Sequence, residues 1–328
     1  MTLDEKTLVA IELADTDTLV RAVDGMAGRR AWDELTLLRT HLAAALERGR
    51  QLWGVDENIR YRLALEAPAS VAVPVVLEGP ARFTLGPLSE VIAQSKSFAE
   101  MDPFLTSRTD RTVIAHERAL RGEPIGGEIE QGVFDIPLVT GWEPRYTLPE
   151  YHSDRADFPA PEPVEGTPID LAVDPVRIED DLTEEALFAL VTPWTTMSNG
   201  VTDLAMVEGD AAAAIAALGV PAATGARVPL EVALEWMAWT AASGGAHGRR
   251  RGMAAGRFLA WSAVAALAGL DWPVDPEELR EAGGSLDWWL WNDGAATGWS
   301  LQMAVGDPGD GLAWAFSAAD ARTEGPDT

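Results

Sequence analysis

Hydrophobic positions recur with a helical period in the first part of this chain. Within residues 1–121 apolar residues repeat every three or four positions, most clearly over Ala31–Leu52. Breaks at Gly79-Pro80 and Gly86-Pro87 interrupt the pattern. Helices are predicted at Asp4–Leu13, Thr18–Ala27, Ala31–Leu52, Asp56–Glu66, Leu88–Met101 and Asp110–Arg121. We therefore expect a helical domain over 1–121, a bundle that resembles helical repeats although no fixed repeat length is visible.

Residues 122–180 lose the helical period and are rich in proline. Proline lacks a backbone N–H and disfavours helix at the residue before it, so little helix can form at this spacing. We predict an extended connection that follows the surface and separates the two halves of the chain.

Residues 181–320 combine both periods. Helical patterns are predicted at Leu182–Leu190, Ala211–Leu218, Pro229–Ser243 and Arg249–Ala268, and strands at Val201–Val207 and Leu286–Asn292. Apolar and small or polar residues then alternate over 299–305 and 312–318, on either side of a Gly/Asp/Pro turn, which predicts a C-terminal hairpin.

The predicted fold class is α+β. A helical N-terminal bundle is followed by an α+β domain over 181–320, in which helices cover one face of a small antiparallel sheet. Residues 321–328 are expected to form a flexible tail.

Composition restricts the function further. The 328 residues include 52 Asp and Glu against 25 Lys and Arg, a net charge of -27, and no cysteine. The charge disfavours nucleic acid and anionic membranes and favours cationic partners. The missing cysteines exclude disulfides, thiolate catalysis and cysteine-ligated metals. The chain shows neither a signal peptide nor an apolar run that could span a bilayer, so we expect a cytoplasmic location.

One stretch concentrates positive charge, and two interpretations of it compete. No Asp or Glu occurs from Trp236 to Leu270. In one interpretation a glycine loop precedes a helix that begins at Arg249, and helix-terminal N–H groups with nearby cations bind a phosphate, nucleotide or carboxylate. The ligand-binding residues would be Gly244, Gly245, His247, Gly248, Arg249, Arg250 and Arg251.

In the second interpretation, which we favour, the stretch is helical throughout. Gly244, Gly248, Gly252 and Gly256 recur at intervals of four, and small residues continue the row, so another helix could pack closely against it. The two interpretations are not exclusive, because the row can pack while His247 and the arginines line a pocket.

Other candidate chemistry is sparse. The thirteen tryptophans could line a ligand pocket, but core packing is the favoured explanation. The four histidines do not lie at metal-ligand spacing, so we predict no metal site and no cofactor. No nucleophile with a neighbouring base can be named, which leaves open whether the protein is an enzyme.

Four segments resemble a known family. They are Trp239–Phe258 (WTAASGGAHGRRRGMAAGRF), the tail segments Thr297–Trp299 and Asp307–Ala315, and His116–Glu123 (HERALRGE). They are similar to an uncharacterised family of high-GC bacterial proteins, a domain of unknown function. The resemblance covers most of the chain and implies one functional unit, but no catalytic residue.

Two functional hypotheses follow. The first is a soluble, acidic, non-enzymatic protein that binds a protein partner or regulates it, with cationic partners favoured. The second is an enzyme or small-molecule sensor that binds an anionic ligand at residues 244–257.

Overall fold

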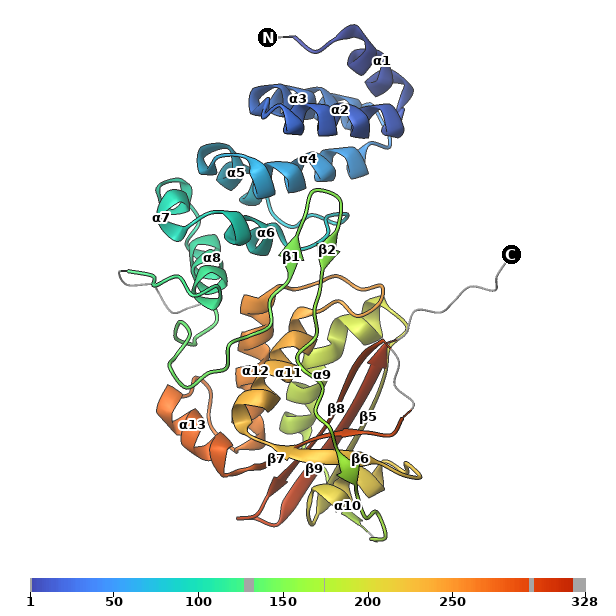
Figure 1. Cartoon of the computed structure of the whole chain (residues 1–328), viewed down its shortest axis with the longest axis vertical. Helices are drawn as coiled ribbons and strands as arrows, with labels where there is room; N and C mark the ends of the chain where they lie inside the picture. The colour runs from blue at the N-terminus through green and yellow to red at the C-terminus, as the bar shows by residue number, and fades with distance from the viewer. Residues whose placement is uncertain (1, 127–132, 174, 295–297, 321–328) are drawn as a thin grey trace, which may run out of the picture. The chain divides into compact units, whose positions relative to one another are not determined.

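The computed structural model of the chain describes residues 2–126, 133–173, 175–294 and 298–320. The chain forms two compact units (Figure 1). Unit 1 consists of Met1–Glu130 and Pro149–Phe158, and unit 2 of Gln131–Leu148 and Pro159–Thr328. The proline-rich residues thus contribute to both units. The tail predicted at 321–328 lies outside the described residues. None of the described helices is long and apolar enough to cross a membrane.

Unit 1 is helical apart from one short hairpin, as the helical period predicted. Its elements are α1 (Glu5–Leu13), α2 (Thr16–Gly28), α3 (Trp32–Glu47), α4 (Trp53–Glu66), α5 (Ala69–Val76), α6 (Leu88–Ser95), α7 (Phe98–Met101), η1 (Asp102–Phe104), α8 (Arg108–Leu120), β1 (Glu150–Tyr151) and β2 (Ala156–Asp157). The helix predicted over Leu88–Met101 is two helices, because Ser97 caps α7 through a capping box with Glu100.

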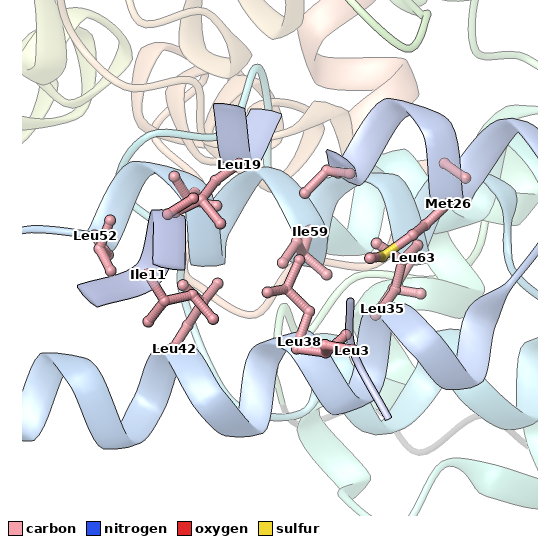
Figure 2. Close-up of a cluster of buried hydrophobic side chains, with 14 of the residues drawn as sticks. Leu3, Ile11, Leu19, Met26, Leu35, Leu38, Leu42, Leu52, Ile59 and Leu63 are labelled. Carbon is pink, nitrogen blue, oxygen red and sulfur yellow. The ribbon is translucent and has the colours of Figure 1, made fainter. Parts of the chain in front are cut away.

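The apolar faces of the first four helices meet in one core (Figure 2). Figure 2 shows Leu35, Leu38 and Leu42 of α3 pointing toward Leu19 of α2 and Ile59 of α4. All five side chains are fully buried. Full burial of such side chains contributes roughly 1.5–3 kcal/mol each. Helices this short are marginal alone, so this shared core stabilises the bundle.

Arginine–carboxylate pairs link the helices around that core. The Arg39 guanidinium of α3 bonds Asp56 of α4 at 2.9 Å and both carboxylate oxygens of Glu78 at 2.8 and 2.9 Å. Burial opposes the charge of Arg39, but the two carboxylates raise the pKa of its guanidinium above the usual value. This forked geometry holds α3 and α4 to the segment that follows α5.

Unit 2 is built on a seven-stranded antiparallel sheet with the order β3-β6-β7-β8-β9-β5-β4. The strands are β3 (Thr167–Pro168), β4 (Val176–Arg177), β5 (Val201–Glu208), β6 (Thr224–Val228), β7 (Asp287–Asn292), β8 (Trp299–Asp307) and β9 (Leu312–Asp320). The predicted hairpin is β8–β9, and the predicted strands before it are β5 and β7. Strands β3, β4 and β6 were not predicted, because they are too short to show alternation.

Helices lie on both faces of this sheet rather than on one. They are α9 (Asp181–Met197), α10 (Ala211–Ala217), α11 (Leu230–Ala242), α12 (Met253–Leu267) and α13 (Pro276–Ser285). The alanine-rich α10 packs with Ala205, Ala304 and Ala315 on one face. On the other face Phe188 of α9 meets Phe316 of β9 edge-on at 6.1 Å between ring centroids. The small residues on the first face allow α10 to approach closely.

A fully buried ion pair fixes the irregular segment at residues 133–148 to α12. The side chains of Glu143 and Arg257 are both 0% exposed, and Arg257 Nε and Nη2 donate to the carboxylate at 2.5 and 2.7 Å. Thr140, Tyr146 and the Trp261 indole also donate to Glu143. Burial alone would raise the pKa of the Glu143 carboxyl, but Arg257 and these hydrogen bonds hold it below its usual range.

Gly256 allows α11 and α12 to pack with their backbones in contact. A Cβ at this position would clash with the carbonyl oxygen of Ala238 and lie 2.7 Å from the Cβ of Ala242. The predicted packing of a small-residue face is therefore correct at Gly256. It requires glycine there, since neither backbone can shift without separating the two helices.

We expect Gly256→Ala to lower the free energy of unfolding by about 1–3 kcal/mol, because the methyl group overpacks a buried helix contact. Urea denaturation followed by tryptophan fluorescence measures the loss. Gly284→Ala in α13 is the control, because no atom lies within 4 Å of its Cβ position. Helix propensity should make that change neutral or stabilising by up to about 1 kcal/mol. Equal effects of the two changes would contradict the packing described.

Candidate functional site

The ten residues between α11 and α12 form a loop, which we call the Gly/Arg loop (residues 243–252). The favoured prediction of a continuous helix through this stretch is therefore wrong. The helix predicted to begin at Arg249 is α12, which begins at Met253. Gly252 is the N-cap residue, with φ of 95°. This left-handed conformation favours glycine and breaks the helix that the four-residue spacing indicated.

Close backbone contacts give the loop its shape. A Cβ on Gly244 would clash with the backbone of Gly248, and a Cβ on Gly248 would clash with the carbonyl oxygen of Gly244. Gly245 has φ of 68°, and a Cβ there would collide with the carboxylate of Asp320. Three of the predicted ligand-binding glycines thus have a structural reason to be glycine.

Two buried polar side chains anchor the loop to its surroundings. The Asp320 carboxylate is 0% exposed and accepts hydrogen bonds from the Ala246 N–H at 2.7 Å and Ser198 Oγ at 2.9 Å. Ser243 Oγ accepts from the Trp194 indole at 2.9 Å and donates to the Thr240 carbonyl at 3.0 Å. Since β9, α9 and α11 supply these partners, the loop is fixed at several points along its length.

The cations predicted to bind an anion have different surroundings. Arg251 is half-buried and donates from Nη1 to the Ala189 carbonyl at 2.7 Å, and burial lowers the pKa of its guanidinium. Arg250 is half-buried and also has an interaction partner. His247 and Arg249 are exposed, and no described residue forms a hydrogen bond or ion pair with either. Only these last two side chains extend into solvent from the loop.

An acidic groove lies on the exposed side of α9, next to the point where Arg251 is bound. This α9 groove has a volume of about 520 Å³ and is lined by Asp181, Glu184, Glu185, Phe188, Ala189 and Thr192. Asp180 begins the helix by accepting a hydrogen bond from the Thr183 N–H. The helix predicted over Leu182–Leu190 is longer than expected, because α9 continues through Pro193 to Met197.

The carboxylates of the α9 groove are available to a partner. Asp181, Glu184 and Glu185 are exposed, and no described cation forms an ion pair with them. Farther along the groove, Phe188 is partly buried against Phe316. The groove therefore offers negative charge beside an aromatic surface.

A second hollow, the tryptophan cleft, lies where β7 and β8 cease to pair. Their ladder ends at Leu290 opposite Met303. Beyond it is a cleft of about 120 Å³, lined by Pro163, Val164, Thr224, Trp236, Leu290, Trp291, Asn292, Ser300, Leu301 and Gln302. The indole nitrogens of Trp236 and Trp291 are buried without a hydrogen-bond partner among the described residues. A molecule that satisfied them would have to offer hydrogen-bond acceptors.

The tryptophans are thus divided between core packing, which the sequence favoured, and a pocket, which it left open. Trp194, Trp261 and Trp288 are fully buried, while Trp236 and Trp291 line the cleft. The α9 groove had no counterpart in the sequence predictions. The one sequence feature that could have indicated the groove is the pair Glu184-Glu185 near the start of an amphipathic helical pattern. Such a pair is common on any solvated helix, so it did not distinguish this one.

We expect the two outer arginines of the loop to differ in their effect on stability. Arg251→Ala removes a charged hydrogen bond to the Ala189 carbonyl and should lower the free energy of unfolding by about 1–2 kcal/mol. Arg249→Ala removes an exposed side chain and should change it by less than about 0.5 kcal/mol. Urea denaturation of the two variants tests this, and an equal loss would show that Arg249 also has a structural role.

Comparison with known proteins gives one match. Residues 17–321 match a family described as a family of unknown function (DUF6183). No curated protein and no solved structure matches the chain.

Proposed function

We propose a protein-binding function for this chain, which belongs to the family of unknown function DUF6183. In this proposal the protein is soluble, cytoplasmic and non-enzymatic, and it binds or regulates a cationic protein partner. The α9 groove is the surface that we assign to that partner. The observation that supports the assignment is the presence of three unpaired carboxylates beside a partly exposed aromatic ring.

The chemistry of the groove suits a basic segment of a protein. Arg and Lys side chains carry a charged end group on an apolar stem. The end group would meet Glu184 and Glu185, while the stem would cover Phe188. Each exposed ion pair contributes at most about 1 kcal/mol. Binding therefore requires several such contacts together with the apolar one.

The charge of the whole protein supports the same class of partner. A net charge of -27 attracts cationic proteins over a Debye length of roughly 8 Å at physiological salt. Such attraction raises the association rate more than the affinity, and it weakens as salt increases. Salt dependence is therefore a signature of the proposed binding.

The alternative proposal is an anionic ligand at residues 244–257. The exposed Arg249 and His247 support it. Fewer cations are available than the sequence suggested, because Arg251 bonds the Ala189 carbonyl and Arg257 is buried against Glu143. A ligand would then meet one or two cations on an open surface, which favours the α9 groove as the main proposal.

A photocrosslinking amino acid at Thr192, which lines the groove, tests the proposal in the host cell. We expect adducts with a protein of positive net charge. Thr36 on α3 is the matched control, because both threonines are exposed and bond the carbonyl four residues earlier. Mass spectrometry identifies the adduct, and position 36 should not give it.

Removing the groove charges provides the second part of the test. Glu184→Gln with Glu185→Gln should reduce the Thr192 adduct at least tenfold. Glu277→Gln with Glu281→Gln on α13 removes the same charge elsewhere and should leave the adduct unchanged. Absence of a Thr192-specific adduct, or an adduct unaffected by the groove charges, would contradict the proposal.

A further inference from the structure

The β1–β2 hairpin of unit 1 brings three metal-binding side chains together. Alternation along β1 buries Tyr151 and turns its neighbours Glu150 and His152 to the opposite side. Asp157 lies directly across from Glu150 in the antiparallel register, so its carboxylate shares that side. The sequence predicted no metal site, because only this strand pairing makes residues 150, 152 and 157 neighbours.

The three side chains converge on a small volume. His152 Nε2 lies 3.0 Å from Asp157 Oδ2 and 3.8 Å from Glu150 Oε1. One ligand atom from each residue lies within 4.8 Å of the other two. Atoms that bind one ion at about 2.0–2.2 Å are roughly 3–4 Å apart. A small rotation of the Glu150 side chain would bring all three within reach of one ion.

The hairpin is held in place by contacts outside this cluster. Tyr61 of α4 donates its hydroxyl to the His152 carbonyl at 2.5 Å. The side-chain amide of Gln94 in α6 pairs with both the N–H and the carbonyl of Tyr151, at 2.6 and 2.8 Å. The Tyr151 hydroxyl donates to the buried Glu90 at 2.6 Å. These bonds fix the backbone that carries two of the three ligands, so little order has to be gained on binding.

The charges around the cluster favour a cation. Arg155 is the one cation of the hairpin, and its nearest approach to Asp157 is 3.6 Å, to Oδ1 rather than to Oδ2. Its guanidinium also lies 3.8 Å from Asp154, and both of these side chains are more than half exposed. Glu150, Asp154 and Asp157 thus outnumber Arg155, and Asp157 Oδ2 forms a hydrogen bond with the imidazole of His152.

We propose that Glu150, His152 and Asp157 bind a divalent first-row transition-metal ion, with Zn²⁺ as the reference case. An imidazole nitrogen with two carboxylates suits Zn²⁺, Mn²⁺ or Fe²⁺ better than Mg²⁺ or Ca²⁺, which prefer all-oxygen sites. Three protein ligands leave at least one coordination position to water. This site does not depend on the α9 groove, which belongs to unit 2.

Isothermal titration of the full-length protein with Zn²⁺, in millimolar Mg²⁺ to occupy weak acidic sites, tests the proposal. We expect one Zn²⁺ per chain. His152→Ala and Asp157→Asn should each weaken binding at least tenfold. His41→Ala on α3 is the control, because it removes an exposed histidine of the same unit and should leave the affinity unchanged. Circular dichroism confirms that each variant is folded.

Visible absorption of bound Co²⁺ provides a second readout that does not rely on the heat of binding. The spectrum of the wild-type protein should show an imidazole ligand, and this signal should be lost in His152→Ala. No Zn²⁺ binding in the presence of Mg²⁺ would overturn the proposal. So would unchanged affinity in both hairpin variants, which would assign the ion to adventitious sites on the acidic surface.

Discussion

The carboxylate of Glu143 and the guanidinium of Arg257 are both removed completely from water inside unit 2. Desolvating two charges opposes folding by several kcal/mol per ion, so the pair persists only where its hydrogen bonds are almost complete. Here Thr140, Tyr146 and Trp261 supply the remaining donors to Glu143, and the Pro137 carbonyl accepts from Arg257. The pair joins the segment around Glu143 to α12, which packs against α9, α11 and α13.

Two candidate surfaces of unit 2, the Gly/Arg loop and the α9 groove, are connected to α12. Gly256 lets α11 approach its backbone, and the Gly/Arg loop connects the two helices. Arg251 of that loop bonds the Ala189 carbonyl of α9, which holds the groove helix against the same core. The groove carboxylates thus stand on a rigid helix instead of a loop, which suits recognition of a partner by charge. In unit 1, the buried Tyr61 and Tyr151 likewise hold the hairpin that carries Glu150, His152 and Asp157.

Periodicity predicted most helices of unit 1, the β8–β9 hairpin and the strands at 201–208 and 287–292. It missed α5, which contains Pro74 inside the helix. The loop at 243–252 was assigned to a helix because glycines at four-residue spacing fit one, whereas a positive φ at Gly252 has no sequence period. Contacts between distant residues left no signal either. Glu143 and Arg257 are 114 positions apart, and the side chains of Glu150, His152 and Asp157 meet only through strand pairing.

A double-mutant cycle at Glu143 and Arg257 tests most directly whether the buried pair organises unit 2. Urea denaturation of Glu143→Gln, Arg257→Met and the double variant is followed by tryptophan fluorescence, since most tryptophans lie in unit 2. Each single change should lower the free energy of unfolding by about 3–5 kcal/mol, because it leaves one buried charge unpaired. The double variant should lose at least about 2 kcal/mol less than the sum of the two. Additive losses would contradict the account, because they would mean that the two charges do not depend on each other.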